Sequence, residues 1–269
     1  MPELPEVETV VNGIKPHIFN QVIKTVWRSP HKLRASNQSD LAEMLEGKKI
    51  IQVSRKAKYI ALHLDSHFDT IIHLGMSGKL IVETHQYQPK KHDHVILGLS
   101  DGTKLVFNDA RRFGMFFWHE SISEYLKHYG KEPLSDDFNT TYLHSICMSR
   151  TTGIKQLIMD QKYVVGVGNI YACEALFSAH IMPRRASNSL SELEVETLVN
   201  CIKAILNKAI EQGGTTLKDY RTADNTLGYF QQRLAVYSRE GDPCYVCGSW
   251  IRNQKISGRS TFFCDHCQS

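Results

Sequence analysis

The sequence predicts an α+β chain with three domains: a β-sandwich with a leading helix, a helical domain, and a small cysteine-bearing hairpin. Three observations support this order. Short β-branched segments occupy most of residues 1–132, helical patterns occupy 133–230, and four of the seven cysteines gather within 235–269. We expect these three ranges to be the domains.

The first domain begins with a helical pattern and continues as strands. Val7, Val11 and Ile14 recur at helical spacing, and Pro5 fits a first helical turn. The short segments that follow are β-branched and partly alternating, and Asp101-Gly102 between two of them is a hairpin signal. A two-layer sandwich or a barrel is therefore expected, with strands at 21–27, 49–54, 58–64, 70–74, 79–83, 95–99 and 104–107.

The second domain carries helical patterns, including one near 169–178. Ser191-Glu-Leu-Glu194 is typical of a capping box, and the apolar stripe after it continues to Gly213-Gly214, where the helix should end. Residues 214–229 are polar and have glycines near their edges, so we expect a mobile loop there.

The third domain is defined by two cysteine pairs. Cys244-x-x-Cys247 and Cys264-x-x-Cys267 are separated by sixteen residues, with Ser257-Gly258 as a plausible hairpin tip. Four thiolates complete the tetrahedral shell that Zn²⁺ prefers, and no open position remains for catalysis. Two disulfides are the alternative, which a reducing compartment disfavours. We expect one structural Zn²⁺, whose binding supplies much of the folding free energy.

Composition is that of an ordinary water-soluble protein. The chain has 269 residues, 42% hydrophobic and 22% charged, and no apolar run approaches the roughly 18 residues of a membrane span. Its acidic, proline-rich start is unlike a secretory signal, so the cytoplasm is expected. The net charge of +4 favours nucleic acid only weakly, and each basic cluster could equally be solvated surface.

The first six residues offer a candidate nucleophile. Methionine before proline is usually trimmed, which would leave Pro2 as a secondary amine that can form an iminium with an aldehyde. An α-amine has a pKa near ~8, so part of it is unprotonated at neutral pH. Glu3 lies beside it, and Glu6 follows three residues later. Alternatively, proline and acidic residues simply start the helix here.

The N-terminal string Met1-Pro-Glu-Leu-Pro-Glu-Val-Glu-Thr9 resembles the start of bacterial formamidopyrimidine-DNA glycosylases. Further matches follow in the family's order: Lys58 in Arg-Lys-Ala-Lys-Tyr, His73-Leu-Gly-Met-Ser-Gly78, Lys91-His-Asp-His94, Asp109-Ala-Arg-Arg-Phe-Gly114, Val165-Gly-Val-Gly-Asn-Ile-Tyr171, Gln212-Gly-Gly-Thr-Thr216 and Gly258-Arg-Ser-Thr-Phe-Phe-Cys264. The resemblance covers the chain end to end. It implies a β-sandwich, a helix–two-turns–helix region and a zinc finger.

The resemblance also implies a function. The family excises oxidised purines, such as 8-oxoguanine and formamidopyrimidines, from duplex DNA and cleaves the strand at the resulting abasic site by β,δ-elimination. Pro2 would attack C1′, Glu3 would be the acid/base for sugar opening, and Glu6 would be a supporting carboxylate. Lys58 would assist β-elimination, and Arg259 δ-elimination.

DNA contacts are implied in the same way. Met76, Arg111 and Phe113 match the residues that fill the gap left by the flipped base; without the resemblance, Met76 and Phe113 would be taken for core residues. The remaining expected contacts are His92, Arg150, Lys155 and Asn169. The loop at 215–226 would close over the flipped base.

Some features leave alternatives open. Many relatives carry a basic residue where this chain has Thr151, so either Thr151 or Arg150 would contact the phosphate. The endonuclease VIII type usually opens Pro-Glu-Gly-Pro-Glu, and Leu4 favours the purine enzyme instead. A non-catalytic DNA-binding relative would not need Pro2, Lys58 or Arg259. We expect a monomer in the bacterial cytoplasm, associated with the nucleoid, that acts on damaged or abasic duplex DNA.

Overall fold

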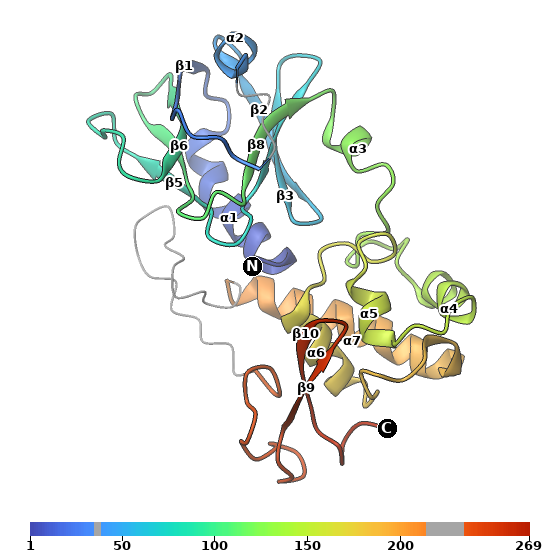
Figure 1. Ribbon diagram of the computed structural model, residues 1–269. Helices are drawn as coiled ribbons and strands as arrows, with labels where there is room; N and C mark the ends of the chain where they lie inside the picture. Colours follow the sequence, from blue (N-terminus) through green and yellow to red (C-terminus); the bar gives the residue numbers. More distant parts are fainter. Residues whose placement is uncertain (35–38, 214–233) are drawn as a thin grey trace. The chain divides into compact units, whose positions relative to one another are not determined.

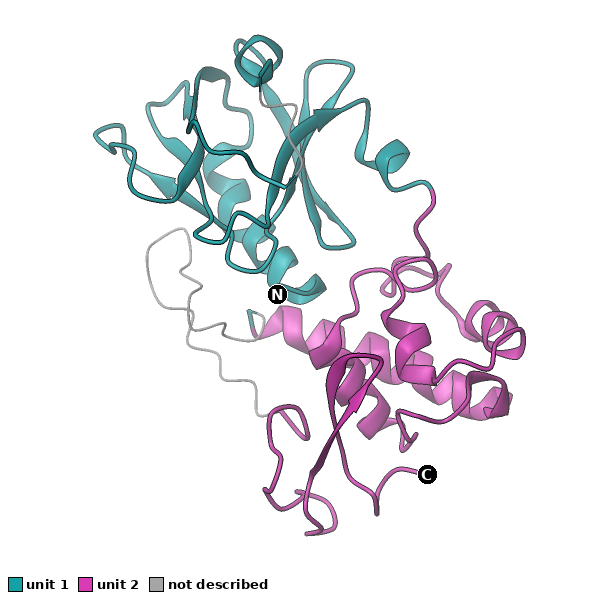
Figure 2. Cartoon of the chain, in the orientation of Figure 1, with its two compact units in different colours: residues 1–127, 213–231 teal, residues 128–212, 232–269 magenta. Residues whose placement is uncertain are grey.

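The computed structural model describes residues 1–34, 39–213 and 234–269 (Figure 1). Within these ranges the chain forms two compact units (Figure 2): the first comprises residues 1–127 and Gly213, the second 128–212 and 234–269. The segment 214–233, which contains the expected loop at 215–226, lies outside the described residues. Among the described helices, none combines the length and the apolar character that crossing a bilayer requires.

The first unit contains the expected β-sandwich, made of two four-stranded antiparallel sheets (Figure 1). One sheet has the strand order β1 (Ile23–Arg28), β6 (Asp93–Leu99), β7 (Lys104–Asn108), β5 (Lys79–Glu83). The other has the order β2 (Ile50–Lys56), β3 (Tyr59–Leu64), β4 (Asp69–His73), β8 (Met115–His119). Its helices are α1 (Leu4–Ile18), α2 (Leu41–Leu45) and α3 (Ile122–Tyr125).

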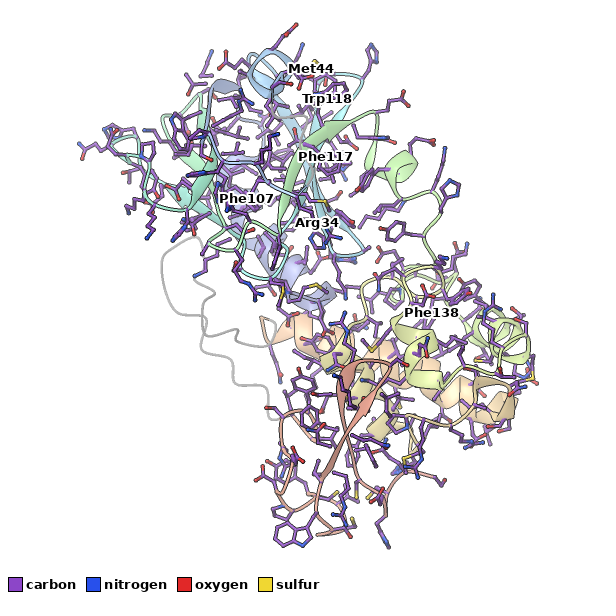
Figure 3. All side chains as sticks on the ribbon, in the orientation of Figure 1. Arg34, Met44, Phe107, Phe117, Trp118 and Phe138 are labelled. Carbon is purple, nitrogen blue, oxygen red and sulfur yellow. The ribbon has the colours of Figure 1, made fainter. Side chains whose placement is uncertain are left out.

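One hydrophobic core joins both sheets to α1. Val7, Val10 and Ile14 of the helix are at most 1% exposed and belong to the same cluster as residues of both sheets. The ring of Phe107 on β7 lies 5.8 Å from that of Phe116 on β8, so aromatic packing links the two layers (Figure 3 labels Phe107). Burial of this apolar surface is the main force that holds the layers together.

The second unit contains helices α4 (Thr140–Met148), α5 (Ile154–Met159), α6 (Asn169–Ser178) and α7 (Glu192–Glu211), a 3₁₀ turn η1 (Ser187–Ser189), and a hairpin of β9 (Arg252–Ile256) and β10 (Arg259–Phe263). Phe138, labelled in Figure 3, is fully buried in this unit. The hairpin turns at Ser257-Gly258, both with positive φ, as the sequence predicts.

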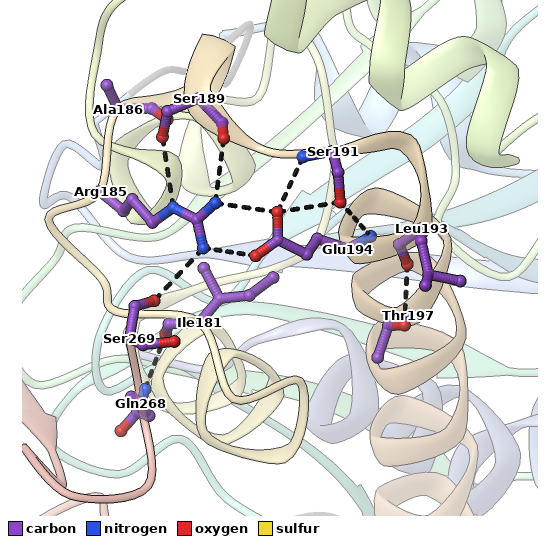
Figure 4. A network of polar contacts seen from close by, with 10 residues as sticks. All are labelled: Ile181, Arg185, Ala186, Ser189, Ser191, Leu193, Glu194, Thr197, Gln268 and Ser269. Carbon is purple, nitrogen blue, oxygen red and sulfur yellow. Dashed lines mark hydrogen bonds and ion pairs between the residues drawn. The ribbon is translucent and has the colours of Figure 1, made fainter.

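Helix α7 begins with the expected capping box. The Ser191 hydroxyl accepts the Glu194 N–H at 3.3 Å, and Glu194 Oε2 accepts the Ser191 N–H at 2.8 Å. The Arg185 guanidinium makes a two-pronged ion pair with the same carboxylate, at 2.5 and 2.8 Å (Figure 4). This start of α7 is therefore fixed both locally and by a residue from the preceding connection.

The cysteine hairpin shares its core with α6. Phe177 and Cys173 of the helix cluster with Ile251 and Phe262 of the hairpin region. The buried Glu174 carboxylate accepts three backbone N–H groups, those of residues 235, 236 and 237, at 2.7 to 2.9 Å. The hairpin is thus packed against the helices rather than suspended from a linker.

Candidate active site and DNA interface

The N-terminal candidates lie at the start of α1. Pro2 is buried, and Glu3 and Glu6 are 4% and 7% exposed. Glu6 Oε2 accepts the Glu3 N–H at 2.8 Å, which orders the backbone next to Pro2. The N-terminal end of the helix dipole favours carboxylates at these positions. In addition, Arg55 Nε donates to Glu8 at 2.6 Å and ties the end of β2 to the first turns of α1.

Lys58 lies in the turn between β2 and β3, three residues after Arg55. Ala57 adopts φ 55°, so the chain reverses between Lys56 and Tyr59, which pair across β2 and β3. Lys58 is 7% exposed, and its charge acts on His73 at the end of β4. Burial, Lys58 and Arg34 together lower the pKa of His73 to about 4. His73 is therefore neutral at pH 7, and its Nδ1 accepts the Gly75 N–H at 3.0 Å.

The three expected inserting residues lie on two loops that touch. Met76 and Phe113 are 44% and 45% exposed, so neither is a core residue, and the Arg111 guanidinium lies 5.1 Å from the Phe113 ring centre. A Cβ on Gly75 would come within 2.5 Å of the Phe113 backbone, so only glycine allows this approach. The structure thus places the loop of Met76 against the loop of Arg111 and Phe113, and all three side chains are exposed.

The Asp109 carboxylate holds the two loops together. It is fully buried and accepts the Ser77 hydroxyl at 2.5 Å and the N–H groups of Arg111 and Gly114 at 3.2 and 2.8 Å. Sequence reasoning placed Asp109 in a motif but gave it no role. The motif around Asp109 does not predict this hydrogen bond, because Ser77 lies 32 residues away along the chain.

His92 lines a cavity of the same unit that also carries other basic side chains. The cavity has a volume of about 460 Å³ and is lined in part by Trp27, His31, Lys91, His92 and Arg112. His92 adopts φ 77°, and its carbonyl accepts the Asp109 N–H at 2.9 Å. The residue is therefore joined through the backbone to the loop that carries Arg111.

In the second unit, Arg259 is exposed at the start of β10, immediately after the hairpin tip. Arg150 packs on Tyr163, with Nε donating to the Tyr163 hydroxyl at 2.9 Å, and Thr151 is exposed beside it. The contact expected of Arg150 or Thr151 stays a prediction.

Lys155, also expected at the DNA, is only 2% exposed, and its Nζ donates to Asn169 Oδ1 at 2.5 Å.

The four cysteines form one cluster. Their sulfur atoms all lie within 4.8 Å of one another, with Cys244 and Cys267 3.8 Å apart and Cys247 and Cys264 3.5 Å apart. Zinc–thiolate bonds of about 2.3 Å in a tetrahedron place sulfur atoms about 3.8 Å apart. None of the four is in a disulfide. The donor set and spacing therefore fit one structural Zn²⁺.

Family comparisons cover nearly the whole chain. Residues 1–116 match the formamidopyrimidine-DNA glycosylase N-terminal domain, 129–221 match the H2TH domain of the same enzyme, and 241–269 match a zinc finger found in FPG and IleRS. The formamidopyrimidine-DNA glycosylase of Escherichia coli O1:K1 is 48% identical over 270 residues, which span 100% of both chains. The enzyme of Rickettsia bellii (strain OSU 85-389) is 45% identical over 271 residues, covering 100% of this chain and 99% of that protein.

Solved structures agree in fold along the full length. The MutM (Fpg) protein of Thermus thermophilus matches with a TM-score of 0.88 at 36% identity, over 99% of this chain and 98% of that one. A point mutant of Lactococcus lactis Fpg in complex with Fapy-dG DNA matches with a TM-score of 0.91 at 34% identity, over 99% of both chains. The same organism's Fpg with abasic-site DNA gives a TM-score of 0.89 at 33% identity, over 99% of both chains. From its sequence, its fold and its cysteine cluster together, this chain belongs to the formamidopyrimidine-DNA glycosylase family.

Proposed function

We propose that this chain is a bifunctional DNA glycosylase and abasic-site lyase that removes oxidised purines from duplex DNA. The observation that carries the proposal is the full-length match to Lactococcus lactis Fpg in complexes with Fapy-dG DNA and with abasic-site DNA. The expected domains at 1–132, 133–230 and 235–269 would then divide the work. The first would form the covalent intermediate, the second would hold the DNA, and the third would hold the DNA and supply Arg259.

After removal of Met1, the first step is attack of the free Pro2 amine on C1′ of the damaged nucleotide. The C1′–N bond breaks, the base leaves with the bonding electrons, and opening of the sugar gives an iminium between Pro2 and C1′. Glu3, which is buried and next to Pro2 in the chain, would exchange the proton that ring opening requires. Glu6 supports it by fixing the Glu3 backbone.

Strand cleavage follows from the iminium. The cation withdraws electrons, so a C2′ proton can leave and the 3′-phosphate is eliminated, after which the 5′-phosphate is lost in a second elimination. Lys58 would assist the first elimination and Arg259 the second. One bound Zn²⁺ would supply the fold of the hairpin that carries Arg259 and would take no part in bond breaking.

Recognition requires the base to leave the helix. Met76 and Phe113 are exposed apolar groups suited to wedge between base pairs, and the Arg111 guanidinium beside them can bond the unpaired partner base. His92, Asn169 and Arg150 or Thr151 would hold phosphates, and the buried Lys155 would act through its hydrogen bond to Asn169. The protein would act as a monomer on chromosomal DNA in the bacterial cytoplasm.

The test is borohydride trapping on a duplex that contains 8-oxoguanine, followed by mass analysis of the adduct. We expect a covalent adduct on the N-terminal peptide, and no trapping when an uncleaved N-terminal tag blocks Pro2, although the tagged protein still binds duplex. Full trapping by an intact tagged protein would move the nucleophile elsewhere, with Lys58 as the next candidate. Faster trapping on an oxidised-pyrimidine duplex would instead indicate the endonuclease VIII type.

A further inference from the structure

The zinc hairpin is tied to α5 and α6 by a set of polar contacts around one buried hydroxyl. Thr261 is fully buried on β10, and its Oγ1 accepts Lys155 Nζ at 2.7 Å. The same hydroxyl donates to the carbonyl oxygen of Arg259 at 3.1 Å. A hydroxyl has one proton, so both bonds can form together only in this arrangement.

Asn169 also takes part in this set of polar contacts. Its Nδ2 donates to the Ser260 carbonyl at 2.8 Å, and its Oδ1 accepts Lys155 Nζ at 2.5 Å. The Lys155 ammonium is a donor, so the amide oxygen of Asn169 must face it. The Ser260 carbonyl is an acceptor, so the amide nitrogen must face that group, and the orientation of the Asn169 amide is determined. Helix α6 begins at this residue, and the β10 backbone is bonded directly to it.

Lys155 is the centre of the set and is only 2% exposed. An ammonium that leaves water needs hydrogen-bond partners, and removal of one of them costs more than the bond itself. The Thr261 hydroxyl is one of the partners that stabilise the Lys155 charge. Through that hydroxyl Lys155 also holds the backbone of Arg259, while the Arg259 side chain remains exposed.

We propose that Thr261 is a positioning residue, whose hydroxyl couples Arg259 to Asn169 so that both engage the same DNA strand. The inference rests on the proposed function, because it needs Arg259 at a phosphate. Because Thr261 is fully buried, it would itself touch neither phosphate nor sugar. It acts by holding the first residue of β10 in a fixed relation to the N-terminus of α6.

The distinguishing measurement is the salt dependence of binding to undamaged duplex. Each phosphate that a cation neutralises contributes about −0.9 to the log–log slope. Arg259→Ala should reduce the magnitude of the slope by about 1. Thr261→Val, which removes no charge and nearly preserves shape, should reduce it by a similar amount, because a misplaced Arg259 no longer pairs with phosphate. Nicking at a preformed abasic site should fall about tenfold.

Thr261→Ser keeps the hydroxyl and should restore both the slope and the nicking rate. Thr197→Val is the matched control, since the Thr197 hydroxyl donates to the Leu193 carbonyl within its own helix, α7 (Figure 4). Adding Thr261→Val to Arg259→Ala should cause little further loss, because both changes remove the same contact. Additive losses would indicate a general structural effect and overturn the proposal.

The outcomes separate the two hypotheses. In one outcome, Arg259→Ala shows a smaller salt-dependence slope and slower nicking, while Thr261→Val keeps one zinc per chain and matches the parent protein. The positioning role of Thr261 is then wrong, and the proposed function stands. If Arg259→Ala also matches the parent, the role of Arg259 itself is wrong. If Thr261→Val loses zinc, the same criteria apply to Thr261→Ala, whose smaller side chain leaves room for water at the Lys155 ammonium.

Discussion

The Ser77 hydroxyl donates to the buried Asp109 carboxylate at 2.5 Å and thereby joins the loop of Met76 to the loop of Arg111 and Phe113. The same carboxylate accepts the Arg111 N–H, so the three exposed side chains share one anchor. Insertion into DNA costs unstacking energy, and a preordered wedge avoids the additional entropy cost of ordering the loops.

Ser77→Ala should therefore weaken both stability and lesion binding. Loss of a hydrogen bond to a buried charge should lower the free energy of unfolding of the first unit by about 1–3 kcal/mol. Affinity for duplex with an abasic-site analogue should also fall. Ser100→Ala is the control, because Ser100 is exposed and bonds Gln21 at the surface. Urea unfolding and fluorescence anisotropy measure the two effects, and equal behaviour of both variants would contradict the shared anchor.

His73 should make the first unit sensitive to mild acid. Its pKa is lowered to about 4 in the folded protein, against about 6.5 when unfolded. The unfolded chain therefore binds the proton first, and stability present above pH 6.5 is lost as the pH falls towards 4, by at most about 3 kcal/mol. His73→Asn keeps an acceptor for the Gly75 N–H but does not titrate. Its urea midpoint should change less than the parent's between pH 7.5 and 5; parallel curves would refute the prediction.

The Arg185–Glu194 pair should act at lower pH in the second unit. The Arg185 hydrogen bond lowers the pKa of Glu194 to about 2, so its stabilisation is present above about pH 4.5 and is lost as the pH falls towards 2. Both side chains are partly exposed, at 26% and 33%, and water screens the pair. Glu194→Gln, which can still complete a capping box, should cost about 0.5–1 kcal/mol at pH 7 and almost nothing at pH 2. Thermal unfolding at the two pH values tests this difference.

Loss of one zinc ligand should unfold the hairpin and leave the sandwich intact. Cys247→Ser removes one of four thiolates, and metal binding supplies much of the folding free energy of so small a module. Zinc per chain should fall well below one, and amide exchange should accelerate in β9 and β10 but not in β3 or β4. Abasic-site nicking should fall as it does in Arg259→Ala. Cys201→Ser, on α7 and outside the cluster, is the control. A full zinc content in Cys247→Ser would rule out the four-thiolate site.

Features that depend on a few neighbouring residues can be predicted from the amino-acid sequence. Ser191 and Glu194 start α7 because their capping box closes within one turn, and the hairpin turns at Ser257-Gly258 because Gly258 readily adopts the positive φ found there. Each Cys-x-x-Cys pair is local in the same way, and the hairpin between the two pairs brings the four sulfur atoms together. Strand β8 was missed, because Met115–His119 is mostly apolar and shows no alternation that would distinguish a strand from a helix.

The way in which side chains from distant segments combine follows from the packing of the folded chain. Lys155 was predicted from its motif to face DNA, but folding buries it against Thr261, 106 residues away. Asp109 bonds Ser77 across 32 residues in the same manner. Such contacts depend on how helices and strands pack around a common core, and no spacing or local preference in the chain encodes which polar groups will meet there.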